Sequence, residues 1–192
     1  MTAGADLHSG SPRRDREKGV SEMEKKGGLE GVVAGTSSIT HVDGQKGKLS
    51  YRGIDIQELA GRSTFEETAY LLWHGTLPAW SELRRLEELL FEDREMPGGV
   101  LRMIVEFMPG WDPMESLRTA ASALSAHDPD VSNLTHEANL GRAISLTART
   151  PVIVATHHRA RQKLDLVPPR RDMSTAANFL YMLRGREPQT GS

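Results

Sequence analysis

The histidines are the residues of this sequence with the widest chemical use, since an imidazole can act as a general base or bind a metal. Of the seven, His157 and His158 are the most suggestive because they are adjacent. Neighbouring residues on a helix point about 100° apart, so these two imidazoles cannot hold one ion together. A pair at i, i+4 would share a face, and the sequence contains none. We interpret both as helix histidines, solvated or partly buried.

The other histidines fit ordinary structural positions. His74 and His127 each precede the expected end of a helix, where a cation suits the negative end of the helix dipole. The remaining three lie near a helix start, on a hairpin and in a terminal tail: His136, His41 and His8. None of these positions predicts a catalytic base.

A run of basic residues is the second candidate site. Its members are Arg159, Arg161, Lys163, Arg170 and Arg171. Such a cluster could bind an anion such as a phosphate of coenzyme A, because a guanidinium matches phosphate oxygens in pairs. It could equally be a solvated face, and the sequence leaves both interpretations open.

The remaining motifs point to structure rather than chemistry. The glycines of Asp43–Gly47 are spaced for a hairpin loop and carry no Gly-Lys-Ser/Thr, so they do not form a phosphate-binding loop. No Ser/His/Asp set follows from spacing, and the chain has no cysteine for thiolate chemistry. From the residues alone we therefore assign no catalytic, cofactor-binding or metal-binding residue. We expect Trp73, Trp80 and Trp111 to fill the core or an interface.

The composition argues against a nucleic-acid-binding, membrane or secreted protein. The 192 residues carry a net charge of −2, with a pI near 6.4, which gives no electrostatic reason to expect nucleic acid or an anionic membrane as a partner. No apolar run is long enough to span a bilayer, and the N-terminus lacks the apolar core of a signal peptide. The absence of cysteine fits a reducing compartment. We predict a cytoplasmic protein.

The elements that would position these residues are one hairpin and a series of helices. Residues 36–42 and 48–52 are rich in β-formers around the loop Asp43–Gly47, and the pattern turns helical after Gly53. Ser63 with Glu66, and Thr64 with Glu67, form two overlapping capping boxes ahead of the next helix. Helices are expected over 65–74, 80–95, 100–108, 113 to about 127, 134–164 and 175–184.

Two of these helices carry further information. Pro151 either kinks the segment 134–164 or begins a second helix there. The final helix, Thr175–Arg184, is apolar on nearly every side, which is typical of a helix inside a large body. Only eight residues follow it. Residues 1–28 mix both charge signs with few apolar side chains, so we expect a disordered tail.

Four stretches of the sequence carry a family resemblance. In order, they are ITHVDGQKGKLSYRGIDIQELA (Ile39–Ala60), FEETAYLLWHGTLP (Phe65–Pro78), RTPVIVATHHRARQKL (Arg149–Leu164) and AANFLYMLRGREP (Ala176–Pro188). Together they resemble the citrate synthase family of bacteria and archaea, and the last stretch resembles the segment ahead of that family's first active-site histidine. The resemblance therefore covers residues 29–188 as an N-terminal helical part of such an enzyme, with a short tail at 189–192.

This resemblance implies an all-α fold with a small N-terminal β-hairpin, working as a homodimer. Its parent reaction is the acyl transfer that condenses acetyl-CoA with oxaloacetate to citrate in the tricarboxylic acid cycle, with acetyl-CoA as a co-substrate and no metal or redox cofactor. The catalytic histidines, the catalytic aspartate and the substrate-binding arginines of the family would all follow Pro188. We therefore carry no catalytic residue over and expect this truncated chain to be inactive alone.

Three alternatives stay open at this point, one of which is that the sequence is an incomplete gene product of a synthase. The chain could be a non-catalytic helical partner, or pseudoenzyme, that pairs with a full-length synthase through its helices. It could also belong to a 2-methylcitrate synthase that uses propionyl-CoA, because the acyl pocket does not lie in the matched stretches.

Overall fold

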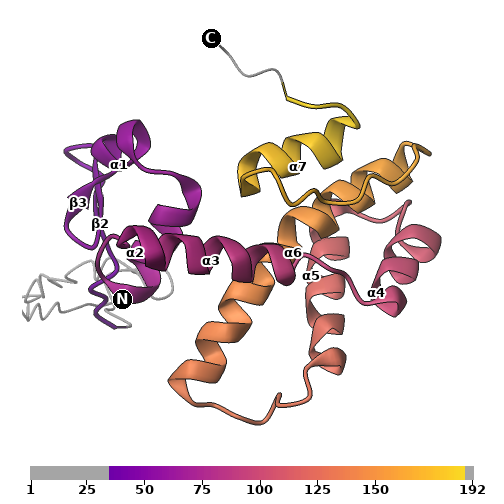
Figure 1. Ribbon diagram of the computed structural model, residues 1–192, viewed down its shortest axis with the longest axis horizontal. Helices are drawn as coiled ribbons and strands as arrows, with labels where there is room; N and C mark the ends of the chain where they lie inside the picture. Colours follow the sequence, from indigo (N-terminus) through magenta and orange to yellow (C-terminus); the bar gives the residue numbers. More distant parts are fainter. Residues whose placement is uncertain (1–34, 189–192) are drawn as a thin grey trace, which may run out of the picture. The chain divides into compact units, whose positions relative to one another are not determined.

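The computed structural model describes residues 35–188 (Figure 1). By internal contacts the chain divides into Met1–Thr36 and Ser37–Ser192, and every element named below lies in the second unit. The predicted tail 1–28 and the final residues 189–192 lie outside the described residues. The elements are β1 (Thr40–Asp43), β2 (Lys48–Tyr51), β3 (Ile54–Asp55), α1 (Ile56–Arg62), α2 (Phe65–His74), α3 (Trp80–Glu92), α4 (Gly98–Arg102), the π-helical turn η1 (Met103–Phe107), α5 (Pro113–Ala123), the 3-10 turn η2 (Leu124–His127), α6 (His136–Arg161) and α7 (Thr175–Arg184).

The fold of the described residues is all-α with a small antiparallel sheet, as predicted. The expected hairpin is confirmed: β1 pairs with β2, with Thr40 opposite Tyr51 and Asp43 opposite Lys48. The sheet has a third strand that the sequence analysis missed, because β3 is only two residues long and the chain turns back through Gly53, whose φ is +88°. Glycine adopts this left-handed region without steric cost, which permits so tight a reversal.

Arg52 links the hairpin to α2. The guanidinium of Arg52 donates from Nη2 to the Leu72 carbonyl oxygen at 2.7 Å and from Nη1 to Ser38 Oγ at 3.0 Å. Leu72 lies in the last turn of α2, where carbonyl groups lack helical partners. Because an isolated two-stranded hairpin is marginal in water, this bond to α2 supplies the support that it requires.

The helix boundaries follow their predicted caps. Thr64 and Glu67 form the capping box of α2, and Gly75 ends it in the left-handed conformation. Asp112 accepts the Met114 N–H at 2.8 Å to begin α5, and Ser174 accepts the Ala177 N–H to begin α7. Each cap satisfies a backbone donor that the first helical turn leaves without a partner.

Helix α3 and the segment after it differ from the prediction. The helix ends at Glu92 rather than at Glu95, because Arg94 turns inward and is buried. The expected helix 100–108 begins at Gly98 and continues as the π-helical turn η1.

Helix α6 is one continuous helix of 26 residues with Pro151 inside it, so the structure decides between the two predicted alternatives. It contributes to three apolar clusters along its length. Ile144 and Ala148 pack with Leu86 and Leu90 of α3, and Ile153 packs with Ile104, Met108 and Ala120. Val152 and Ala155 pack with Met182 of α7. In Figure 1, α5 and α7 accordingly lie along the C-terminal half of α6.

Among the described helices, none combines the length and the apolar composition needed to cross a membrane.

Candidate functional site

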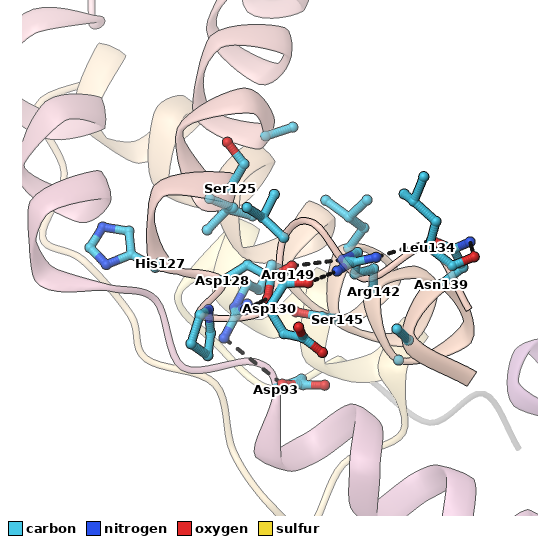
Figure 2. A pocket seen from close by; sticks show the side chains of 17 residues that line it. Asp93, Ser125, His127, Asp128, Asp130, Leu134, Asn139, Arg142, Ser145 and Arg149 are labelled. Carbon is cyan, nitrogen blue, oxygen red and sulfur yellow. Dashed lines mark hydrogen bonds and ion pairs between the residues drawn. The ribbon is translucent and has the colours of Figure 1, made fainter. Parts of the chain in front are cut away.

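A cavity of about 640 Å³ opens between α5 and the N-terminal half of α6 (Figure 2). Its walls come from the end of α5, η2, the loop 128–135, one face of α6, and Asp93 after α3. The apolar part of the lining includes Leu124, Leu134 and Leu146. Two arginines, Arg142 and Arg149, supply its positive charge. A pocket of this size that mixes apolar surface with a few polar groups is the usual setting for ligand binding.

Arg142 of α6 holds the loop 128–135 beside the cavity by hydrogen bonds. Its Nε donates to Asp128 Oδ2 at 2.7 Å, and its Nη1 donates to the Asn133 carbonyl oxygen at 2.5 Å and to Asn139 Oδ1 at 3.1 Å. Nη2 donates to the carbonyl oxygen of Asp130. The hydrogen bond from Arg142 holds the pKa of Asp128 below its usual value, because it stabilises the ionised carboxylate. The guanidinium is thus committed to the loop rather than to a ligand.

Arg149, further along α6, lies beside Asp93 (Figure 2). Its Nη1 donates to Ser145 Oγ at 2.5 Å and its Nε to the Glu95 carbonyl oxygen at 3.1 Å, while Nη2 lies 3.9 Å from Asp93 Oδ1. Burial raises the pKa of Asp93, and the charge of Arg149 opposes this shift. Arg149 therefore joins α6 to the segment that follows α3.

The arrangement has little capacity for acid–base or nucleophilic chemistry. The hydroxyl of Ser125 donates to the Ser122 carbonyl oxygen at 2.8 Å, and the exposed His127 lies at the edge of the cavity. In residues 35–188, no group of three or more His, Asp or Glu side chains is placed to hold a metal ion. The lining thus combines apolar side chains with two arginines that are already bonded to the protein itself.

A smaller hollow, of about 350 Å³, lies between α2, α3 and α6. The rings of Tyr70 and His74 stack there with centroids 4.1 Å apart. Glu82 accepts the Ala79 N–H at 2.7 Å, which caps α3, and its carboxylate raises the pKa of the Tyr70 hydroxyl by hydrogen bonding. These contacts join the end of α2 to the start of α3, so we interpret them as structural.

The described histidines occupy separate places. His157 is buried, and its Nε2 donates to the Met108 carbonyl oxygen at 3.0 Å, whereas His158 is exposed. Both are helix histidines, as predicted, but the expectation that they are solvated or partly buried is wrong for His157, which is 5% exposed because the Met108 carbonyl oxygen accepts its N–H within the core. His74 and His127 end α2 and η2 as expected, and His136 begins α6. His41 is exposed on β1, and His8 lies outside the described residues.

The members of the basic run make separate contacts. Arg159 fits neither interpretation, because it is buried and donates to the Leu183 carbonyl oxygen at 3.3 Å. Arg161 donates to the Trp111 carbonyl oxygen at 3.3 Å. Arg170 pairs with Asp172 and Glu187, Arg171 covers the ring of Phe91, and Lys163 is exposed. Four of the five side chains are thus engaged within the chain.

The tryptophans divide between core and surface. Trp73 packs against the α3–α6 cluster, as predicted. Trp80 is 74% exposed, so the core interpretation is wrong for it within this chain, and Trp111 is also exposed.

The predicted hairpin loop is confirmed, with the Lys46 N–H bonded to Asp43 Oδ1 at 3.0 Å.

The sequence analysis missed a buried polar network. Glu66, assigned to a capping box with Ser63, instead accepts the backbone N–H of Thr175 from more than 100 positions along the chain, at 2.8 Å. Arg94 donates to the hydroxyl of Thr175 at 2.9 Å. The sequence held one indication of this network. Of the two overlapping capping boxes only one can form, so one of the two glutamates had to be available for another partner.

Comparison with known proteins places these features in context. Residues 28–192 match the family model described as "Citrate synthase, C-terminal domain". The chain is 43% identical over 169 residues to citrate synthase of Haloferax volcanii, covering 86% of this chain and 45% of that protein. It is 38% identical over 165 residues to 2-methylcitrate synthase of Mycobacterium tuberculosis, covering 86% of this chain and 42% of that protein.

Solved structures agree. The crystal structure of citrate synthase from Pyrobaculum aerophilum matches with a TM-score of 0.78 at 38% identity, over 84% of this chain and 42% of that one. The citrate synthase of Thermoplasma acidophilum, in its ternary complex with carboxymethyl coenzyme A and oxaloacetate, matches with a TM-score of 0.77 at 26% identity, over 83% of this chain and 42% of that one. The chain thus spans less than half the length of these relatives.

Proposed function

The chain belongs to the citrate synthase family, and from this premise we propose that it is the part of a citrate synthase that precedes the catalytic histidine. The parent reaction is acyl transfer, in which acetyl-CoA condenses with oxaloacetate to give citrate and free coenzyme A. The observation that carries this proposal is the similarity over residues 28–192 to enzymes of which the chain spans 42–45%.

In this proposal the described residues are the scaffold and not the reaction centre. The condensation requires a base that removes a proton from the acetyl methyl group and donors that polarise the ketone of oxaloacetate. The arginines of the cavity are engaged with the protein itself, and His157 is bonded to a backbone carbonyl. We therefore infer that the catalytic groups belong to chain beyond Pro188, as the resemblance of Ala176–Pro188 implies.

The direct test is release of coenzyme A from acetyl-CoA in the presence of oxaloacetate, followed with a thiol reagent. The chain contains no cysteine, so the protein gives no background signal. We expect no turnover above the blank for this chain alone. Clear turnover would overturn the assignment of the catalytic groups to chain beyond Pro188. Reading the downstream DNA is the complementary test, and a histidine-bearing helical continuation is expected.

A 2-methylcitrate synthase is the second candidate, favoured by the 38% identity to the Mycobacterium tuberculosis enzyme. The two reactions differ by one methylene in the acyl group, which a hydrophobic pocket distinguishes by about 1–3 kcal/mol. Once the continuation is joined to this chain, the ratio of kcat/KM for propionyl-CoA to that for acetyl-CoA decides between them. A ratio above one would overturn the citrate synthase assignment.

We also propose that the chain pairs with another copy or with a full-length synthase. Large apolar side chains stay exposed, among them Leu134 of the cavity at 79% and Met114 in the first turn of α5 at 69%. Exposed apolar surface can mark a protein interface. Light scattering with size-exclusion chromatography should give a mass of twice the monomer, or co-elution with a full-length synthase. A monodisperse monomer that binds neither would contradict the pairing and with it the alternative of a non-catalytic helical partner.

No metal or redox cofactor forms part of the proposed reaction, and acetyl-CoA enters as a co-substrate. The cytoplasmic location stays a prediction from the sequence.

A further inference from the structure

The fully buried side chains of helix α7 are mostly polar. Its buried residues are Thr175, Asn178 and Met182, which recur at intervals of three and four and so share one face. Two of the three are polar. Buried polar side chains bind only in the geometry that satisfies their hydrogen bonds, so this face fixes the rotation of α7 more than apolar packing would.

Three buried residues hold the N-terminus of α7. Glu66 Oε1 accepts the Thr175 N–H at 2.8 Å, and Arg94 Nη2 donates to Thr175 Oγ1 at 2.9 Å. Glu66, Arg94 and Thr175 are each 4–5% exposed. Glu66 comes from α2 and Arg94 from the turn after α3, so two separate elements meet at one residue. We call these three residues the latch.

The charges of the latch depend on each other. Burial lowers the pKa of Arg94, and the nearby Glu66 carboxylate opposes that shift. Removing one partner of a buried charged set leaves the other without compensation, which costs far more than a surface ion pair does. We therefore expect the contacts of the three latch residues to form together and to be lost together.

The segment before α7 is attached to α7 itself. The Arg170 N–H donates to Asn178 Oδ1 at 3.0 Å, and Asn178 Nδ2 donates back to the Arg170 carbonyl oxygen. Arg170 is also paired with Asp172 and Glu187 on either side of the helix. Residues 162–174 contain no helix or strand. The segment also contacts the helices before it: Arg94 Nη1 donates to the carbonyl oxygens of Arg170 and Met173 at 3.5 Å, and Arg159 Nε donates to the Asp165 carbonyl oxygen. The guanidinium of Arg171 covers the ring of Phe91. Movement of this segment with α7 therefore breaks these contacts as well as those of the latch.

The other end of α7 is held more weakly. Arg159 Nη1 donates to the Leu183 carbonyl oxygen at 3.3 Å, which is longer than the two bonds of the latch. The apolar contact beneath α7 centres on Val152, Ala155 and Met182, with Phe179 and Tyr181 of α7 packed against it. Of the hydrogen bonds between α7 and the helices before it, the two of the latch are thus the shorter ones.

We propose that α7 and residues 165–174 form a flap on α6, closed by the Glu66–Thr175–Arg94 latch, which opens as a unit while the other helices stay folded. Opening exposes the apolar strip of Val152 and Ala155 on α6. Local opening of this kind has a lower free energy than global unfolding, because only the contacts of one element are lost.

The absence of cysteine allows a test with single thiols. Ala155 and Ala148 form a matched pair: both lie on α6, seven residues apart, and each is 1% exposed. Ala155 lies beneath α7, whereas Ala148 packs against α3. In A155C and A148C proteins, the rate of reaction with a thiol reagent measures how often each site opens. We expect Glu66→Ala to accelerate labelling of A155C by roughly tenfold or more and to leave A148C almost unchanged.

Thr175→Val is the milder variant, because it removes only the acceptor of Arg94 and keeps the backbone N–H for Glu66. A smaller acceleration, again confined to A155C, is expected. Equal acceleration at A155C and A148C in both variants would show that the whole chain opens, and would overturn the flap. No acceleration at A155C in either variant would overturn the latch.

The unity of the latch is tested with Arg94→Met. The Glu66→Ala/Arg94→Met double variant of A155C should label no faster than the faster of the two single variants, since the second change removes a contact already lost. Labelling rates that multiply would show two independent contacts and would overturn the latch as a unit.

Discussion

Helices α5 and α7 both pack against the C-terminal half of α6, but they do so by opposite means (Figure 1). Helix α5 contributes Ala120 to an apolar cluster with Ile104, Met108 and Ile153, which are at most 1% exposed. Helix α7 instead buries Thr175 and Asn178, with Met182 as its one fully buried apolar side chain. Apolar burial stabilises without direction, whereas hydrogen bonds are satisfied in one geometry only.

The contrast separates two contributions: the apolar region under α5 contributes most to the free energy of unfolding, and the polar region under α7 fixes the position of that helix. The apolar region under α5 excludes water over a continuous surface, so we expect it to unfold with the whole molecule. The polar region under α7 gains less from burial, since each hydrogen bond replaces one to water. It fixes the setting of α7 and leaves that helix easier to release. Four substitutions or titrations would break or sharpen this comparison.

The largest effect is expected from Ile104→Ala in the apolar region. Ile104 is fully buried, so the change removes its transfer free energy and leaves a cavity. The free energy of unfolding should fall by about 2–5 kcal/mol in urea denaturation. Phe107→Ala is the matched control, because Phe107 lies in the same turn but is 67% exposed. An equal loss for both would contradict the assignment of this core.

The next largest effect is expected from Asn178→Ala in the polar region. The change leaves the N–H and the carbonyl oxygen of Arg170 without their partner, at a cost of about 1–3 kcal/mol. Hydrogen exchange should become faster in α7 and stay unchanged in α5. Asn139→Ala provides the control, since Asn139 is exposed. Faster exchange in α5 as well would erase the distinction between the two regions.

A smaller loss of stability is expected from alanine substitutions at the glycines that end α7 and α2. Comparing the two separates the cost of backbone strain from the cost of a close side-chain contact. Gly185 has a φ of +71°, and a Cβ there would lie 3.0 Å from Arg159 Nη1. Gly75 ends α2 with a φ of +86° and nothing within 4 Å of the added Cβ. Gly75→Ala should therefore cost the strain alone, about 1–2 kcal/mol, and Gly185→Ala should cost more in thermal denaturation. Equal costs would show that Arg159 yields freely.

The smallest effects concern the two aspartates of the cavity. The folded-state pKa of Asp128 is lowered, so its contribution is present above its unfolded pKa and is lost as the pH falls through the folded value. The pKa of Asp93 is raised, so the ionised carboxylate is disfavoured and stability falls as the pH rises from the unfolded value to the folded one.

Unfolding measured from about pH 3 to pH 7 should therefore show opposite changes in the two variants. Asp128→Asn should reduce the loss of stability in acid, and Asp93→Asn should increase stability toward neutral pH relative to the parent. Changes of the same sign would contradict the assigned environments.

The sequence by itself determined the local structure. The capping box of Thr64 and Glu67, the Asp112 and Ser174 caps, and Gly75 and Gly185 mark helix ends, because each acts on backbone groups within a few residues. The hairpin loop was predictable for the same reason. The ordered resemblance of four stretches identified the family.

Only the tertiary structure decided the long-range partners. Nothing near Glu66 in the sequence shows that it caps α7, because Thr175 reaches it only after α2 and α7 have packed. The same holds for Arg94 and Arg159, whose charges predict exposure and which are buried because backbone carbonyl and hydroxyl oxygens surround them. Pro151 stays within one helix because both halves of α6 are fixed by separate clusters. Hydrogen bonds between residues close in the sequence can be predicted from it. The partners of buried polar side chains cannot, because they meet only in the packed fold.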